Sequence, residues 1–182
     1  MRVCIEPGHS TSDPGAVVEG IREADIVQAV AKRLVALSGD GIAYEPKRRP
    51  AVSNGFSLLI ATLRNNPPDV IVSLHCDSSA RDPQKHICRV YHADRGDSKR
   101  LATALAFAAR STISEHSAVV KAPWDRAGKP YTYPLLRIGK RASCLVELGY
   151  LSDVHAREAM QTEAWQAKAA RVLDLAIRGW AK

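Results

Sequence analysis

The sequence predicts an α/β domain built on a largely parallel sheet. Short apolar runs alternate along the chain with longer amphipathic segments, as expected when strands are joined by crossover helices. Several apolar runs are continuous rather than alternating, which is typical of strands covered on both faces. The 182 residues, 46% apolar and 25% charged, have the size and composition of one globular domain. Because no linker, repeat or low-complexity tract interrupts the pattern, we expect a single domain over residues 1–182.

The individual elements follow from hydrophobic periodicity. The predicted strands are the apolar runs Arg2–Ile5, Ile42–Tyr44, Val70–His75, Ile87–His92 and Ser143–Leu148. The predicted helices carry apolar residues at helical spacing, as Ile26, Val30 and Leu34 show for the first of them. These helices cover Glu23–Leu37, Asn54–Asn65, Ser98–Ile113 and Glu163–Trp180.

Three segments between these elements are long and irregular, namely Glu6–Arg22, Cys76–His86 and Ser114–Pro134. Loops of this length inside a compact domain are often functional. The first two directly follow predicted strands, and open α/β sheets bind their ligands at the carboxyl ends of strands. We therefore expect a functional site at this edge of the sheet.

Composition and charge narrow the classes of partner. The net charge of +7 favours a polyanion, which includes nucleic acid, anionic lipid and anionic cell-wall polymers. Only 5% of the residues are aromatic, and no basic–aromatic interleaving suited to base stacking occurs, so we expect no nucleic-acid partner. No apolar run approaches the roughly 18 residues of a membrane span.

The amino terminus and the cysteines indicate a protein made and folded in the cytoplasm. The opening MRVCIEPGHS lacks the apolar core of a secretory signal peptide. The four cysteines form no C-x-x-C pair, and we expect them to be buried or semi-buried free thiols.

Two histidines stand at predicted strand ends. The first strand runs into Glu6-Pro7-Gly8-His9, where proline stops the ladder and glycine permits a sharp turn. The third ends in Ser73-Leu74-His75. If these two strands are neighbours, both imidazoles stand at one edge of the sheet, an arrangement that suits a metal ion.

Two glutamates complete this candidate site. Glu23 lies three positions before Ile26 and therefore shares the inward face of its helix, where an unpaired charge is prohibitive. Two imidazoles and one carboxylate form a familiar ligand set for catalytic zinc. Glu147 closes a buried strand and is suited to act as general base on water and then as general acid to a leaving nitrogen.

Each of these residues also has a purely structural interpretation. A histidine at a strand end is often a satisfied structural residue, and Glu23 could simply complement the helix dipole. Glu147 could be an exposed carboxylate at a strand end. The combination favours a metal site, although spacing alone leaves the structural alternative open. The remaining histidines have polar sequence neighbours, and we interpret them as surface residues: His86, His92, His116 and His155.

Four sequence segments resemble the type 3 class of zinc-dependent N-acetylmuramoyl-L-alanine amidases. CIEPGHSTSDPGAV and GIREADIVQAVAKRL are similar to the family's opening strand, its D-P-G-H turn, its D-P-G-A loop and its first helix. VIVSLHCDSS and CLVELGYLSD are similar to the second histidine motif and the catalytic glutamate motif. The matches occur in the family's order from residue 1 to about 180, which makes the set specific.

The resemblance implies one Zn²⁺ ion held by His9, Glu23 and His75, with catalysis by Glu147. It implies a twisted, mostly parallel six-stranded sheet with helices on both faces. It also suggests that Arg137 contacts substrate, with a surface ion pair as the alternative.

Some residues depart from the family's pattern and put the fit of the substrate in doubt. Glu6 stands where Asp is usual, as a carboxylate that could orient His9. Cys76 and Asp77 replace a small residue and Asn after the second histidine.

These features lead to one functional hypothesis with two alternatives. We expect the chain to hydrolyse the amide bond between N-acetylmuramic acid and L-alanine in peptidoglycan, as a phage-type endolysin that reaches the wall after release. The basic surface would aid adsorption to anionic wall polymers. The alternatives are another zinc peptidase acting on wall peptides and a catalytically inactive wall-binding module. We expect no separate wall-binding domain, and the sequence does not indicate an oligomeric state.

Overall fold

A six-stranded sheet forms the centre of the computed structural model, which describes residues 1–47, 50–82, 87–110, 113–121, 124–126 and 129–182. The strand order is β4-β1-β5-β10-β6-β7. The strands are β1 (Arg2–Pro7), β4 (Ala43–Pro46), β5 (Val70–Asp77), β6 (Cys88–His92), β7 (Ser117–Lys121) and β10 (Ala142–Tyr150). All neighbouring strands run parallel except β10 and β6, which are antiparallel. The predicted mostly parallel sheet is confirmed.

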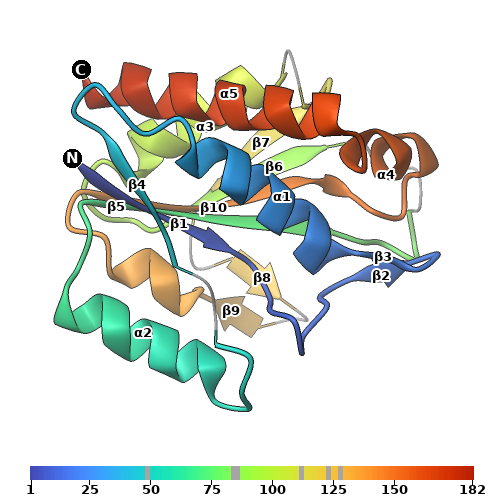
Figure 1. Cartoon of the computed structure of the whole chain (residues 1–182), viewed down its shortest axis with the longest axis horizontal. Helices are drawn as coiled ribbons and strands as arrows, with labels where there is room; N and C mark the ends of the chain where they lie inside the picture. Colours follow the sequence, from blue (N-terminus) through green and yellow to red (C-terminus); the bar gives the residue numbers. More distant parts are fainter. Residues whose placement is uncertain (48–49, 83–86, 111–112, 122–123, 127–128) are drawn as a thin grey trace.

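Helices cover both faces of the sheet, also as predicted (Figure 1). One face carries α1 (Glu23–Val35), α3 (Ser98–Arg110) and α5 (Glu163–Ala181), and their apolar stripes form the larger core. The other carries α2 (Gly55–Asn65) and the 3₁₀ helix η1 (Pro134–Arg137), which enclose a second core. The short helix α4 (Val154–Met160) links β10 to α5.

The two cores show which side chains of the central strands share a face. In β5, Val72 and Leu74 belong to the larger core and Ile71 to the second one. Because side chains alternate along a strand, His75 points to the same side as Ile71. By the same alternation Glu147 of β10 follows Leu145, which packs in the second core. The sheet therefore presents His75 and Glu147 on its α2 side.

The segments predicted to be irregular contain short strands. Glu6–Arg22 includes a hairpin of β2 (Val17–Val18) and β3 (Ile21–Arg22). The prediction for Ser114–Pro134 is wrong in that this segment contains the edge strand β7 and the hairpin of β8 (Trp124–Arg126) and β9 (Lys129–Tyr131). Strand β7 pairs with one neighbour only, so its burial does not produce the continuous apolar run that marked the central strands.

The four cysteines are free and buried, as predicted. His116 and His155 are exposed, as predicted, and His86 lies outside the described residues. The prediction for His92 is wrong because this side chain is only 3% exposed and its Nδ1 bonds the carbonyl of Ala93 at 2.9 Å. Strand β6 alternates buried and half-buried residues, and His92 occupies a buried position of that alternation. Within the described ranges, no helix is both long and apolar enough to cross a membrane.

Candidate metal centre

His9 is placed by a tight turn at the carboxyl end of β1. The backbone N–H of Gly8 donates to the carbonyl of Leu74 at 2.8 Å, and His9 itself adopts φ +68°, in the left-handed region. A Cβ at Gly8 would lie 2.4 Å from Cε1 of His75. Only glycine therefore lets the turn pass this close to the second imidazole.

Glu23 is the first residue of α1 and is 3% exposed, so the prediction that it faces inward is confirmed. The backbone N–H of Ala16 donates to its Oε2 at 3.0 Å, and that of Cys76 donates to its Oε1 at 2.9 Å. A Cβ at Gly15 would lie 2.4 Å from the same Oε2. Backbone N–H groups from the loop before β2 and from strand β5 thus hold the carboxylate in one position.

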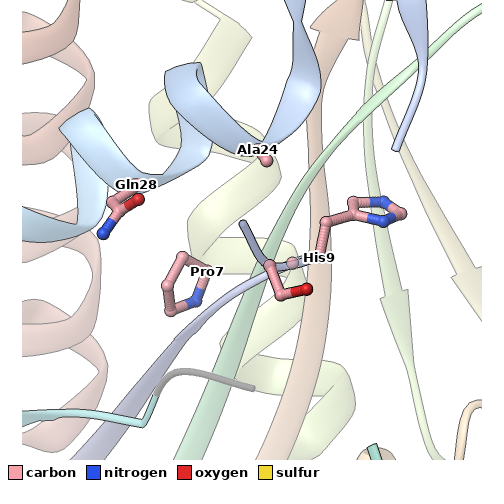
Figure 2. Close-up of a pocket in the computed structure, with 6 residues that line it drawn as sticks. Pro7, His9, Ala24 and Gln28 are labelled. Atoms are coloured by element: carbon pink, nitrogen blue, oxygen red, sulfur yellow. The ribbon is translucent and has the colours of Figure 1, made fainter. Parts of the chain in front are cut away.

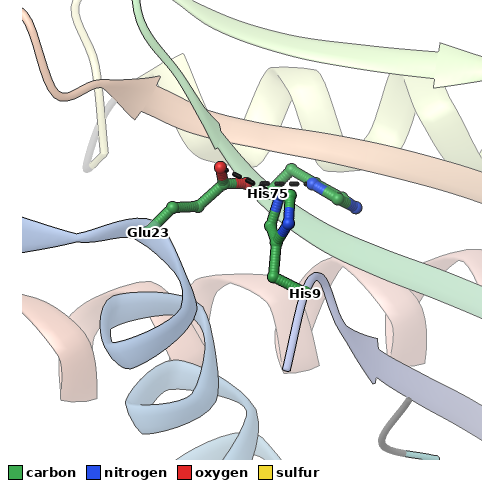
Figure 3. A group of neighbouring side chains, drawn as sticks. All are labelled: His9, Glu23 and His75. Atoms are coloured by element: carbon green, nitrogen blue, oxygen red, sulfur yellow. Dashed lines mark hydrogen bonds and ion pairs between the residues drawn. The ribbon is translucent and has the colours of Figure 1, made fainter. Parts of the chain in front are cut away.

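The three predicted ligands converge, as Figure 3 shows. Nε2 of His9 lies 3.0 Å from Oε2 of Glu23, and Nδ1 of His75 lies 2.9 Å from Oε1. One ligand atom from each residue lies within 4.8 Å of the others. The two imidazole rings meet edge to face, with centroids 5.1 Å apart.

The charges of the three side chains are tightly coupled. Burial alone would raise the pKa of Glu23, but the hydrogen bonds with His75 and His9 outweigh burial and lower that pKa well below its usual range. Burial would lower the pKa of His75, yet the bond to Glu23 and the charges of Glu147 and Glu6 raise it to about 9. The pKa of His9 is also raised, because Glu23 and Asp13 outweigh its burial. The negative charge of the carboxylates raises the pKa of both imidazoles, and the same negative charge favours a bound metal cation.

Glu147 stands directly beside this cluster. It pairs in register with His75 across β10 and β5, so both side chains share one face of the sheet. Burial raises the pKa of Glu147 to about 8, with Asp77 and Glu23 adding to the rise and the charge of His75 opposing it. A carboxyl group whose pKa lies near neutrality is suited to accept and return a proton.

The donor set and two orphaned atoms fit a bound metal. Two imidazoles and a carboxylate are the ligands of one common class of catalytic zinc site. Among the described residues, Nε2 of His75 and Oε2 of Glu147 are buried without a hydrogen-bond partner. Buried polar atoms rarely lack partners. Two such atoms on the adjacent strands β5 and β10 therefore indicate a site that binds a ligand.

Asp13 is a site residue that the sequence did not single out. Its Oδ2 lies 3.0 Å from Nδ1 of His9, the nitrogen opposite the one that contacts Glu23. A carboxylate in that position fixes the orientation of a ligating imidazole. We expected this role for Glu6, but Glu6 is fully buried and accepts a hydrogen bond from the hydroxyl of Ser73. The available signal was the position of Asp13 four residues after His9 in the D-P-G loop.

Arg137 is not part of this cluster. It ends η1 with an exposed side chain, and its carbonyl accepts a hydrogen bond from Arg95. Two residues on, the N–H of Gly139 donates to Oγ of Ser143, near the amino end of β10, whereas Glu147 lies toward the carboxyl end. A contact between Arg137 and substrate stays a prediction.

A small hollow lies behind the turn that carries His9 (Figure 2). It is lined by Pro7, Gly8, His9, Ser10, Ala24 and Gln28. The ring of His9 is directed away from Gln28, and neither Glu23 nor His75 lines the hollow. The hollow therefore adjoins the candidate metal centre at His9 but does not include the other two proposed ligands.

Comparison with known proteins identifies the family. A family model described as N-acetylmuramoyl-L-alanine amidase (Amidase_3) matches residues 3–178. The protein YqiI of Bacillus subtilis (strain 168), described as uncharacterized, is 26% identical over 172 residues, which is 92% of this chain and 79% of that protein.

Two solved amidases share the fold over nearly their whole length. The amidase AmiC2 of Nostoc punctiforme has a TM-score of 0.82 at 22% identity, covering 100% of this chain and 97% of that one. The CwlD amidase of Clostridioides difficile, solved in complex with the GerS lipoprotein, has a TM-score of 0.84 at 20% identity, covering 99% and 98%. Because the family model spans nearly the entire sequence, the chain belongs to the N-acetylmuramoyl-L-alanine amidase family of peptidoglycan hydrolases.

Proposed function

We propose that this amidase is zinc-dependent and that His9, Glu23 and His75 hold one ion. The observation that carries the proposal is the convergence of two imidazoles and a buried carboxylate, with ligand atoms within 4.8 Å of one another. The substrate bond is the amide between N-acetylmuramic acid and L-alanine in peptidoglycan. When bound, zinc supplies Lewis-acid activation of water and of the scissile carbonyl.

The protein's own residues perform the remaining tasks. Glu147 accepts the proton of the attacking water and returns it to the leaving nitrogen of L-alanine. Because Glu147 of β10 pairs with His75 of β5, the proposed proton acceptor lies on the strand next to a proposed metal ligand. Burial raises the pKa of Glu147 to about 8. The positive charge of a bound zinc ion would lower this pKa, so that the group could act as a base at neutral pH.

The orientation of the ligands is set by the surrounding backbone and by Asp13. The N–H groups of Ala16 and Cys76 hold the two oxygens of Glu23. Asp13 contacts Nδ1 of His9 and leaves Nε2 to face Glu23. A site held this firmly before substrate arrives loses little energy to reorganisation during the reaction.

We further propose a lytic role of the endolysin type, in which the enzyme degrades the wall after release from the cytoplasm. The net charge of +7 supports adsorption to an anionic wall, and this attraction weakens as salt screens it. Arg137 is proposed as a substrate contact at the exposed end of η1. Turbidity loss of wall suspensions tests the lytic role, and suspensions that stay turbid contradict it. The same measurement at rising salt concentration tests adsorption by charge, which lysis indifferent to salt contradicts.

Identification of the new chain ends in digested peptidoglycan tests the bond that is cleaved. The amidase releases free amino groups on L-alanine, and Glu147→Gln, which keeps the shape of the side chain, serves as the inactive control. New ends only between peptide residues would show a wall peptidase instead. An unchanged wall polymer that still binds the protein would show a wall-binding module.

A further inference from the structure

A third polar side chain continues the row formed by His75 and Glu147. In the antiparallel pairing of β10 with β6, Glu147 is directly opposite Arg89. Residues opposite each other on neighbouring strands point to the same face of a sheet. His75, Glu147 and Arg89 therefore lie in one row across β5, β10 and β6. With strands about 4.8 Å apart, the backbones at the two ends of the row are separated by roughly 10 Å.

The guanidinium of Arg89 is held in place but not enclosed. Its Nη1 donates to the phenol oxygen of Tyr150 at 2.7 Å, and a second hydrogen bond joins it to Tyr91. The phenol of Tyr150 also hydrogen-bonds Asp77, whose Oδ2 lies 3.9 Å from Nη1 of Arg89. The Arg89 side chain is 26% exposed. Since a guanidinium has five N–H donors, these contacts within the described residues leave donors available to a ligand.

The direction of the reaction tells which part of the substrate meets Arg89. In the reaction proposed above, the scissile carbonyl is directed at the cluster of His9, Glu23 and His75, and the leaving nitrogen is directed at Glu147, which returns a proton to it. The leaving peptide then extends past Glu147 and away from His75, which is toward β6. The next side chain of the row in that direction is Arg89.

We propose that Arg89 recognises a carboxylate of the leaving peptide and so determines which stem peptides the enzyme prefers. This inference rests on the proposed function. A guanidinium pairs with a carboxylate through two parallel hydrogen bonds, which makes it selective for a carboxylate over the neutral carboxamide of the same shape. The substrate class is a muramoyl peptide with a free α-carboxylate on the residue after L-alanine.

Two small substrates that differ at one group test this proposal on the zinc-loaded enzyme. They are N-acetylmuramoyl-L-alanyl-γ-D-glutamyl-L-lysine and N-acetylmuramoyl-L-alanyl-D-isoglutaminyl-L-lysine, in which a carboxamide replaces the α-carboxylate of the second residue while the γ-carboxyl of that residue is amide-linked to lysine in both. We expect Arg89→Gln to lower kcat/KM about 10- to 100-fold on the acid, the usual effect of losing a charge-assisted hydrogen bond, and to change it little on the amide. Arg89→Lys, which keeps the charge, recovers part of the loss on the acid. Equal losses of Arg89→Gln on both substrates overturn the proposal.

Arg33→Gln is the matched control. Arg33 has a similar exposure of 28% and pairs with Glu163, and it lies near the end of α1 that is remote from Glu23. Arg33→Gln removes the same charge as Arg89→Gln. If the preference for the acid over the amide falls equally in both variants, it reflects net charge, and the proposal is overturned. Zinc content must be the same in all variants.

The outcome for the wild type separates this inference from the proposed function. If the wild-type protein cleaves neither these compounds nor peptidoglycan, the proposed function is refuted, and the assignment of Arg89 is refuted with it. Wild type that cleaves peptidoglycan but does not distinguish acid from amide refutes only the role of Arg89. If the compounds are too short to be cleaved, their competition with wall digestion gives the same comparison. The acid must then inhibit more strongly, and Arg89→Gln must remove the difference.

Discussion

The substitution Gly15→Ala should separate backbone strain from damage to the ligand cluster. Gly15 has φ +68°, and an added Cβ would lie 2.4 Å from Oε2 of Glu23 and 2.6 Å from Cδ2 of His9. The shortest ordinary contact is 3.4 Å, so the carboxylate must retreat by about 1 Å, the difference between 3.4 and 2.4 Å. Displacing a positioned group by about 1 Å costs on the order of 100-fold, and disturbing the partners of a metal ligand costs about 10- to 100-fold in affinity.

Gly20→Ala supplies the control from the same connection between β1 and α1. Gly20 has φ +80°, and an added Cβ would meet nothing within 4 Å. Both substitutions place alanine in the left-handed region and should each lose about 1–2 kcal/mol of the free energy of unfolding. Only Gly15→Ala also displaces a proposed ligand.

Two measurements on the same preparations separate backbone strain from damage to the ligand cluster. Urea unfolding in the presence of a chelator gives the free energy of unfolding without metal, and its decrease measures the strain. Competition with a chromogenic chelator gives the zinc affinity. We expect similar losses of stability in the two variants, with a loss of zinc affinity of about 10- to 100-fold only in Gly15→Ala. Wild-type zinc affinity in Gly15→Ala, or an equal loss in Gly20→Ala, would refute the placement of Glu23 as a ligand.

Three further predictions concern the site residues directly. Glu147→Ala should retain zinc but lose at least about 100-fold in turnover, and near-normal turnover would reassign the proton acceptor. His9→Ala should lose bound metal, and full metal occupancy by elemental analysis would contradict its role. The pKa of His75, about 9 in the metal-free protein, lies above its ordinary 6.5, so protonation stabilises the metal-free fold fully below pH 6.5 and not above pH 9. Because zinc must displace this proton, the increase in Tm that zinc produces should grow between pH 6.5 and 9, and a constant increase would contradict the assignment.

The position of Glu23 could be predicted because helix periodicity requires it. Ile26 and Val30 mark the buried stripe of α1, and a residue three positions before Ile26 must face inward as well. His75 followed from the end of a buried run, and parallel strands bring such ends to one edge of the sheet. Local patterns of apolar residues therefore carried enough information for these side chains.

Other features depend on tertiary contacts that leave little trace in the sequence. The left-handed turn at His9 is held by the approach of Gly8 to β5, and the sequence does not indicate it because φ +68° is uncommon for residues other than glycine. The polar residues near His92 in the sequence suggested that it is exposed. The side chain instead occupies a buried position in the alternation of β6, and the polarity of sequence neighbours does not indicate this position. The role of Arg89 depends on the register of β6 with β10, which no sequence period determines.

The most direct test of the account is the amidase rate of the purified protein after complete metal removal and after addition of zinc back to one equivalent. The account predicts that release of L-alanine amino groups from peptidoglycan ceases without metal and returns with a single equivalent in the wild type, but not in His9→Ala. Undiminished release by protein shown to be metal-free would contradict it.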